Sequence, residues 1–139
     1  TLFPYTTLFR SDTYLACNFF SNDINRSTYF SGIKNNFINE WKLIFDEYGK
    51  INDIIVTSGQ GYIMSGVSYW TKKDGLFLKE KLEEAIKQRD FKQLYWDNIV
   101  KENLNNVEVY IEKISGDSWF EIDNLDDLNL LKKYSQLRC

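Results

Sequence analysis

The sequence predicts an α/β fold class that carries a β-hairpin excursion. Short β-rich runs alternate with amphipathic helical segments, and the runs at 40–46 and 51–57 are joined by a short turn containing Gly49. The stretch from Trp119 to Leu128 reads as a strand that passes at once into a helix. A chain of 139 residues with 43% hydrophobic and 17% aromatic side chains can build one domain core, which argues against global disorder.

The N-terminal half is predicted to be mainly β. Residues 1–11 (TLFPYTTLFRS) resemble the translated remnant of a sequencing adapter, so we expect a non-native leader followed by one domain over 12–139, the alternative being an N-terminal strand. Residues 12–25 are expected to form an extended entry and a short helical turn. Strands are then predicted over Ser27–Ile33, Glu40–Asp46, Ile51–Thr57 and Tyr62–Trp70, with a turn at residues 58–61 (SGQG).

Two helices and a strand are predicted next. Thr71 should cap a helix that runs to about Arg89, because Asp74 stands at the capping-box position. Its apolar face would comprise Leu78, Leu82, Ala85 and Ile86. Phe91–Leu104 suggests a shorter helix with Ile99, Val100 and Leu104 turned inward. Val107–Ile114 is predicted to be a strand with Val107, Val109 and Ile111 on one face.

The stretch from Trp119 to Leu128 (WFEIDNLDDL) is the junction on which a functional reading depends. Phe120 and Ile122 alternate with Glu121 and Asp123, and Asn124 can cap a helix that continues through Leu128, Leu131 and Tyr134, with Asp127 reinforcing the cap. A strand that ends in an acid places its carboxylate on the rim of the sheet, where ligands bind in open α/β folds. The alternative is an ordinary strand–helix junction.

Composition excludes several function classes. With 17 basic and 20 acidic residues and a net charge of −3, the chain offers no bulk electrostatic case for binding nucleic acid or inserting into an anionic membrane. Cys17 and Cys139 do not make a disulfide framework, which favours the cytoplasm. Because there is no histidine, any chemistry must use carboxylates, hydroxyls, Lys, Arg or a hard cation held by oxygen.

Two groups of side chains could carry chemistry. Asp12 and Asp123 would suit Mg²⁺, which favours one or two carboxylates with phosphate oxygens and water, if the two strand ends converge. Tyr95, Trp96 and Asp97 stand in succession and cannot all face one core. Aromatic faces bind quaternary ammonium, and a nearby carboxylate balances its charge. The alternative is that most of the rings are core packing.

Six motifs carry a family resemblance over most of the chain. They are RSTYFS (Arg26–Ser31), NEW (Asn39–Trp41), DIIV (Asp53–Val56), SGVSYW (Ser65–Trp70), LYWDNIVKEN (Leu94–Asn103) and EID (Glu121–Asp123). In order and spacing they resemble the C-terminal half of bacterial CTP:phosphocholine cytidylyltransferases, of the sugar-nucleotidyltransferase-like superfamily. The resemblance implies the C-terminal part of a Rossmann-like nucleotidyltransferase mixed sheet with a β-hairpin excursion, residues 12–139 forming the acceptor-substrate half.

The resemblance also implies an activity, which is transfer of CMP from CTP to phosphocholine to give CDP-choline and pyrophosphate. It assigns Mg²⁺ to Asp12 and Asp123, and it assigns the choline head to Trp41, Tyr95, Trp96, Asp97 and Glu121. The Gly-rich loop and Pro-Lys of the family's nucleotide-binding half have no counterpart here, so we assign no catalytic residue and expect this chain alone to be inactive. The alternatives are a non-catalytic choline-binding module, a purely structural domain, or a transferase for a sugar phosphate or phosphoethanolamine.

Overall fold

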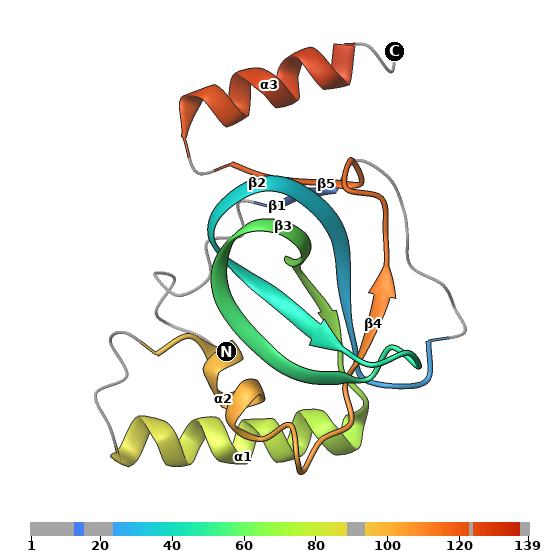
Figure 1. Cartoon of the computed structure of the whole chain (residues 1–139). Coiled ribbons are helices and arrows are strands. Elements are labelled where there is room, and N and C mark those ends of the chain that lie inside the picture. The colour runs from blue at the N-terminus through green and yellow to red at the C-terminus, as the bar shows by residue number, and fades with distance from the viewer. Residues whose placement is uncertain (1–12, 16–23, 89–93, 123, 137–139) are drawn as a thin grey trace.

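A long, curled β-hairpin dominates the computed structural model, which describes residues 13–15, 24–88, 94–122 and 124–136 (Figure 1). Strand β2 (Thr28–Phe45) and strand β3 (Ile51–Tyr69) pair antiparallel from Thr28 opposite Tyr69 to Phe45 opposite Ile51. The turn at Gly49 therefore joins two strands, as predicted. The predicted leader, Asp12 and most of the predicted helical turn at 16–23 lie outside the described residues.

The hairpin is longer and more continuous than the sequence predicted. The two strands predicted before the Gly49 turn are one continuous strand, β2, and the two predicted after it are one continuous strand, β3. The predicted turn at residues 58–61 is therefore wrong, because these residues belong to β3. The register shifts several times along the hairpin, and Asn36 and Asn39 in β2 adopt φ of 59° and 56°. Gly59 and Gly61 in β3 also have positive φ. These residues bend paired strands instead of reversing the chain, since bulges use residues that tolerate positive φ.

A third strand makes the sheet mixed. Strand β4 (Tyr110–Lys113) lies parallel to β2, so the order is β3-β2-β4. This strand is shorter than the predicted Val107–Ile114. The predicted apolar face is confirmed, because Val107, Val109 and Ile111 are all buried in the main core cluster. Strand β2 is consequently the central strand, with neighbours on both edges.

The two middle helices pack on this core. Helix α1 (Lys72–Gln88) begins as predicted, with the Asp74 N–H donating to Thr71 Oγ1 at 3.2 Å. Leu78 and Ala85 are buried, but Ile86 is 51% exposed, contrary to the prediction. Eight residues along a helix turn the side chain by about 80° from the direction of Leu78, which takes Ile86 off the buried face.

Helix α2 (Trp96–Glu102) is shorter than the predicted Phe91–Leu104, of which residues 91–93 lie outside the described part. Ile99 and Val100 are buried as predicted, and Leu104 packs partly buried against the same cluster.

A separate two-stranded ribbon leads into the last helix. Strand β1 (Thr13–Leu15) pairs antiparallel with β5 (Trp119–Glu121), and α3 (Leu125–Gln136) follows. Asn124 Oδ1 accepts from the Asp126 and Asp127 N–H groups at 2.8 and 3.0 Å, and the Asp127 carboxylate accepts from the Asn124 N–H at 3.1 Å. The predicted cap is therefore confirmed.

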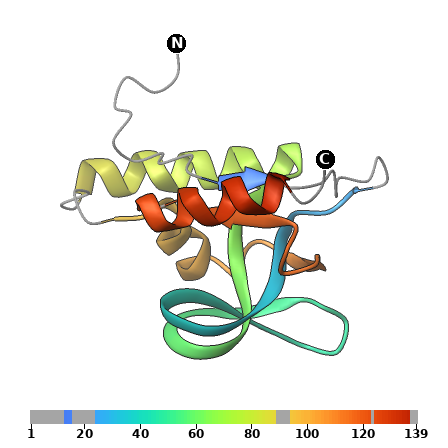
Figure 2. The same cartoon turned by 90° about the horizontal axis from the view of Figure 1, so that it is seen from above.

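The elements lie on two sides of the hairpin. Helices α1 and α2 lie on one side, and the β1–β5 ribbon with α3 lies on the other (Figure 1). Seen from above, the curled part of β2 and β3 projects beyond the helices, which is the predicted excursion (Figure 2). Among the described residues, no helix is long and apolar enough to cross a membrane.

Candidate substrate-binding site

Five aromatic residues gather where the hairpin meets α2. We call Tyr29, Trp41, Trp70, Tyr95 and Trp96 the aromatic cluster. The Tyr29 ring centroid lies 5.5 Å from that of Trp70 and 6.1 Å from that of Trp96, and Trp70 lies 5.7 Å from Trp96. Trp41 meets Tyr95 edge to face at 5.9 Å. These spacings are typical of favourable aromatic pairs, so the cluster joins β2 to the start of α2.

The start of α2 is held by its own hydrogen bonds. Tyr95 precedes the first helical residue, and its N–H donates to Asn98 Oδ1 at 2.9 Å. Lys101 then forms an ion pair with Asp53 of β3 at 3.4 Å. Each contact is individually weak because it is partly exposed, and the burial of Ile99 and Val100 holds α2 on the core.

Asp97 supplies the charge of the site. Its Oδ1 accepts a hydrogen bond from the Tyr29 hydroxyl at 2.5 Å. Burial raises the pKa of the Asp97 carboxyl to about 6, although the hydrogen bond from Tyr29 lowers it in part. The pKa of Tyr29 is raised well above its usual value by burial and by the Asp97 charge, so its hydroxyl remains a donor. The site therefore holds a carboxylate that loses its proton just below neutral pH.

Among the described residues, no Lys or Arg covers a ring face of the aromatic cluster. Six Lys or Arg contacts with ring faces occur in the described part of the chain, and they involve Tyr110, Trp119, Phe120, Phe77, Phe45 and Tyr62. None involves the aromatic cluster. Tyr95 is 62% exposed and Trp41 is partly buried, so this pair can meet a cation from solution.

The predicted choline residues separate into three groups. Trp41 and Tyr95 form a ring pair at the exposed side of the cluster, and Asp97 follows Tyr95 by two positions with its carboxylate bound to Tyr29. Trp96 adjoins them but packs inward on Tyr29 and Trp70.

Glu121 lies on β5 opposite Thr13, and its charge acts on Lys34. Lys34 also donates to the Gly116 carbonyl and stands 4.4 Å over the Trp119 ring. The described contacts thus place Glu121 in a different environment from Asp97.

The predicted metal ligands, Asp12 and Asp123, lie outside the described residues. In the described ranges, no group of three or more His, Cys, Asp or Glu is arranged to hold a metal ion. The strands that lead to the two aspartates are placed, however. Thr13, at the start of β1, pairs with Glu121, at the end of β5. The start of β1 and the end of β5 therefore lie at the same end of the ribbon.

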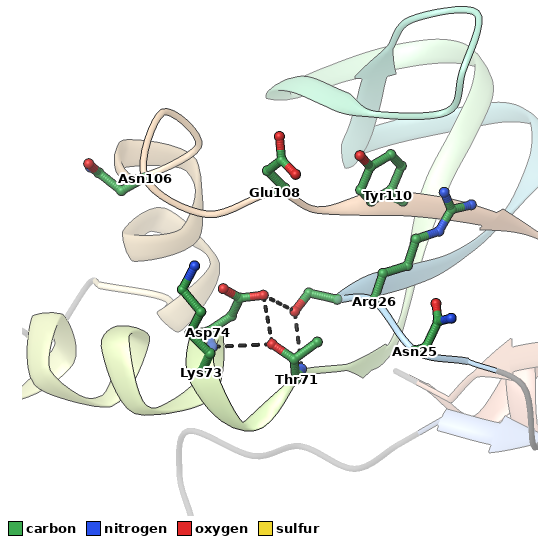
Figure 3. A pocket seen from close by; sticks show the side chains of 9 residues that line it. Asn25, Arg26, Thr71, Lys73, Asp74, Asn106, Glu108 and Tyr110 are labelled. Carbon is green, nitrogen blue, oxygen red and sulfur yellow. Dashed lines mark hydrogen bonds between the residues drawn. The ribbon is translucent and has the colours of Figure 1, made fainter.

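A hollow at the start of α1 is lined by polar residues that stabilise the fold. It is lined by Asn25, Arg26, Ser27, Thr71, Lys73, Asp74, Asn106, Glu108 and Tyr110 (Figure 3). The Ser27 hydroxyl donates to the Asp74 carboxylate at 2.5 Å and accepts from the Thr71 N–H at 3.1 Å, and the Thr71 hydroxyl donates to the same carboxylate at 2.8 Å. Because these polar groups satisfy one another, they tie α1 to the start of β2.

Sequence reasoning missed Tyr29, which links the sheet to Asp97. The signal available was a tyrosine inside the RSTYFS motif, since a buried tyrosine hydroxyl needs a hydrogen-bond partner. The sequence did not identify that partner, because Asp97 lies 68 positions away.

The structure is similar to that of a solved nucleotidyltransferase. The chain superposes with a TM-score of 0.82 on CTP:phosphocholine cytidylyltransferase from Streptococcus pneumoniae, at 41% identity over 88% of this chain and 54% of that one. The α/β mixed sheet is thus the fold of a nucleotidyltransferase, over about half the length of that structure, as predicted.

Sequence comparison gives the particular relatives. Choline-phosphate cytidylyltransferase of Streptococcus pneumoniae is 41% identical over 123 residues, which are 88% of this chain and 54% of the relative. The enzyme of the same name from Haemophilus influenzae is 34% identical over 119 residues, 84% of this chain and 51% of the relative. No protein-family model matches. The predicted resemblance to bacterial CTP:phosphocholine cytidylyltransferases is confirmed, and the chain spans about half the length of these relatives.

A more distant relative has a different acceptor in its name. 2-Aminoethylphosphonate cytidylyltransferase of Lancefieldella rimae is 27% identical over 104 residues, 75% of this chain and 42% of the relative. All three relatives are named as cytidylyltransferases; two names give choline phosphate as the acceptor and the third gives 2-aminoethylphosphonate.

Proposed function

We propose that this chain forms the acceptor-substrate part of a cytidylyltransferase that transfers CMP from CTP to phosphocholine. The single observation that carries the proposal is the Trp41–Tyr95 ring pair, with Asp97 two positions after Tyr95, in a chain that is 41% identical to a choline-phosphate cytidylyltransferase. A trimethylammonium group has no hydrogen to donate, so it is best held by ring faces and by a carboxylate at short range.

In this proposal the choline head rests against Trp41 and Tyr95. Asp97 balances its positive charge, while Trp96 holds the rings from behind by packing on Trp70. Glu121 remains a proposed second acid, with its charge shared with Lys34. Binding the head in this way leaves the phosphate of phosphocholine free to point away from the aromatic cluster.

We assign the metal site, as a proposal, to Asp12 and Asp123. The common end of β1 and β5 supports this assignment, as does the preference of Mg²⁺ for carboxylate oxygens. When bound, Mg²⁺ would offset the negative charge that gathers on the phosphates during transfer.

The proposed reaction is a displacement at phosphorus. A phosphate oxygen of phosphocholine forms a bond to the α-phosphorus of CTP, the bond to the bridging oxygen breaks, and pyrophosphate leaves. The part played by the described residues is to bind and orient the acceptor, since orientation alone lowers such barriers substantially. The cytoplasm, which is where we place the protein, supplies CTP.

A pyrophosphate-release assay tests the proposal. It would be run with CTP, Mg²⁺ and phosphocholine on this chain and on a version extended upstream from the source DNA. We expect activity in the extended version only. Absence of activity in both, with phosphocholine still bound by calorimetry, would support a choline-binding module without chemistry instead. Absence of both activity and binding would refute the proposed function.

A second candidate acceptor is a primary amine such as phosphoethanolamine or 2-aminoethylphosphonate, which the Lancefieldella rimae relative supports. A primary ammonium donates three hydrogen bonds and would depend more on acids than on rings. The same assay with phosphoethanolamine distinguishes the two, because the Trp41–Tyr95 pair favours the quaternary head.

A further inference from the structure

Tyr29 connects the central strand of the sheet to the acid of the candidate site. It is 1% exposed and lies in the central strand, opposite Ser68 of β3 and Ile111 of β4. Pairing on both edges fixes its backbone, and packing against Trp70 and Trp96 fixes its ring. The position of its hydroxyl is therefore set by the sheet rather than by α2.

Asp97 lies in the first turn of α2, which Ile99 and Val100 anchor in the main core cluster. Helix α2 has seven residues, and its ion pair to the hairpin, Lys101 with Asp53, is partly exposed and so contributes little. The 2.5 Å hydrogen bond from Tyr29 is the strong contact of the Asp97 side chain, because a bond to an ionised group in a partly buried place is worth more than a neutral one.

We propose that Tyr29 is a positioning residue for choline recognition: its buried hydroxyl fixes the orientation of the Asp97 carboxylate, the acid assigned to the choline cation. The inference rests on the proposed function, in which Asp97 balances the cation. Tyr29 itself is covered by Trp70 and Trp96, so it acts on the ligand through Asp97 and does not touch it.

Among the described residues, Tyr29 is the titratable side chain that acts on the pKa of Asp97, which makes the effect measurable. The Tyr29 hydroxyl faces it from β2 and stays protonated, because its pKa lies well above the usual value. On α2 the cation Lys101 is engaged with Asp53. Removing the hydroxyl should therefore raise the pKa of Asp97 further, since that hydrogen bond favours the ionised form.

The test is the substitution Tyr29→Phe in the full chain, which removes one oxygen and keeps the ring. Tyr62→Phe is the matched control, because Tyr62 is also a hairpin tyrosine but its ring packs 5.4 Å from Phe45. Thermal unfolding first checks that both variants fold. The carboxyl carbon of Asp97 is then titrated by NMR without ligand, and phosphocholine affinity is measured by calorimetry at pH 6 and pH 8.

We expect the Asp97 midpoint to rise by about one unit in Tyr29→Phe, which weakens phosphocholine binding about fivefold at pH 6 and less at pH 8. Tyr62→Phe should change neither quantity. The double variant with Asp97→Asn should bind no more weakly than Asp97→Asn alone. An unchanged Asp97 midpoint overturns the positioning role whether or not ligand binds. If Tyr29→Phe shifts the Asp97 midpoint but the wild-type chain binds no phosphocholine, the positioning role stands and the proposed function is refuted.

Discussion

Two regions of the molecule combine aromatic rings with charge, but in opposite ways. Beside β5, the chain's own Lys34 covers the faces of Trp119 and Phe120, at 4.4 and 5.6 Å from the ring centroids. In the aromatic cluster the added charge is an acid, Asp97, and no cation of the described chain covers the rings. The first region satisfies its rings internally, whereas the second has rings and a carboxylate that suit a cation from outside.

Aromatic content alone does not indicate a ligand site. Trp119 is 1% exposed and Lys34 packs on it, so this region stabilises the fold. Tyr95 is 62% exposed, and Asp97 two positions later is a largely buried carboxylate whose charge is costly to bury even with the hydrogen bond from Tyr29. A ligand site is therefore better indicated by exposed rings together with a buried carboxylate, because this arrangement does not favour stability of the protein alone.

The largest expected effect concerns the end of the β1–β5 ribbon. In an extended version that shows turnover, Asp123→Asn should abolish Mg²⁺-dependent activity with little loss of fold, because a neutral amide is a weaker ligand for Mg²⁺. Pyrophosphate release measures the activity, and circular dichroism checks the fold. Phosphocholine binding should persist. Retained activity would refute the metal assignment.

Asp97→Asn should weaken phosphocholine binding by about tenfold or more, because it removes the charge that balances the cation. Calorimetry at pH 7.5 measures the affinity. Glu47→Gln, an exposed acid in the hairpin turn, is the control and should have no effect. Equal losses in both variants would point to overall charge rather than to the site.

Trp41→Ala should weaken phosphocholine binding roughly three- to thirtyfold, the range expected for one ring face against a desolvated cation. CTP binding by the extended version should be unchanged. Trp41→Phe keeps a ring at the same place and should recover most of the affinity. A raised KM for CTP alone would show that Trp41 belongs to another part of the site.

The raised pKa of Asp97 also predicts how stability depends on pH. Its folded-state pKa of about 6 exceeds the usual aspartate value of 3.8, so the folded protein binds the proton more tightly. The contribution to stability is therefore fully present below about pH 4 and is lost as the pH rises through 6, by at most about 3 kcal/mol. Urea unfolding at pH 4 to 7 should show this decline in wild type but not in Asp97→Asn. A parallel decline in both would assign it to other groups.

Glu121→Gln should have the smallest effect, about twofold on phosphocholine affinity, because the Glu121 charge is already shared with Lys34. The measurement is the same titration as for Asp97→Asn. A loss equal to that of Asp97→Asn would make Glu121 a full member of the cation site. It would also show that the two regions contribute to one site.

Local patterns in the sequence predicted local structure well. The caps at Thr71 and Asn124, the turn at Gly49 and the buried face of Val107, Val109 and Ile111 follow from spacing within a few residues. The prediction was wrong at residues 58–61, where Gly indicated a turn. Whether glycine reverses a strand or bends it depends on the partner strand, which spacing does not reveal.

The same limit applied to the site. The motifs led to Trp41, Tyr95 and Asp97. The structure brings the two rings together, while Asp97 follows Tyr95 by two positions in the sequence. The hydrogen bond from Tyr29 could not be predicted, because it joins residues 68 positions apart. Likewise, the effect of the Glu121 charge on Lys34 depends on how the hairpin lies against β5.

The most direct test of the cation site compares phosphocholine with 3,3-dimethylbutyl phosphate, which has the same shape and no positive charge. Calorimetry would measure both affinities for the wild-type chain and for Asp97→Asn. We predict that wild type binds phosphocholine at least about tenfold more tightly, and that Asp97→Asn reduces most of this preference. Equal affinities of wild type for the two compounds would contradict the account, because the site would then recognise shape without charge.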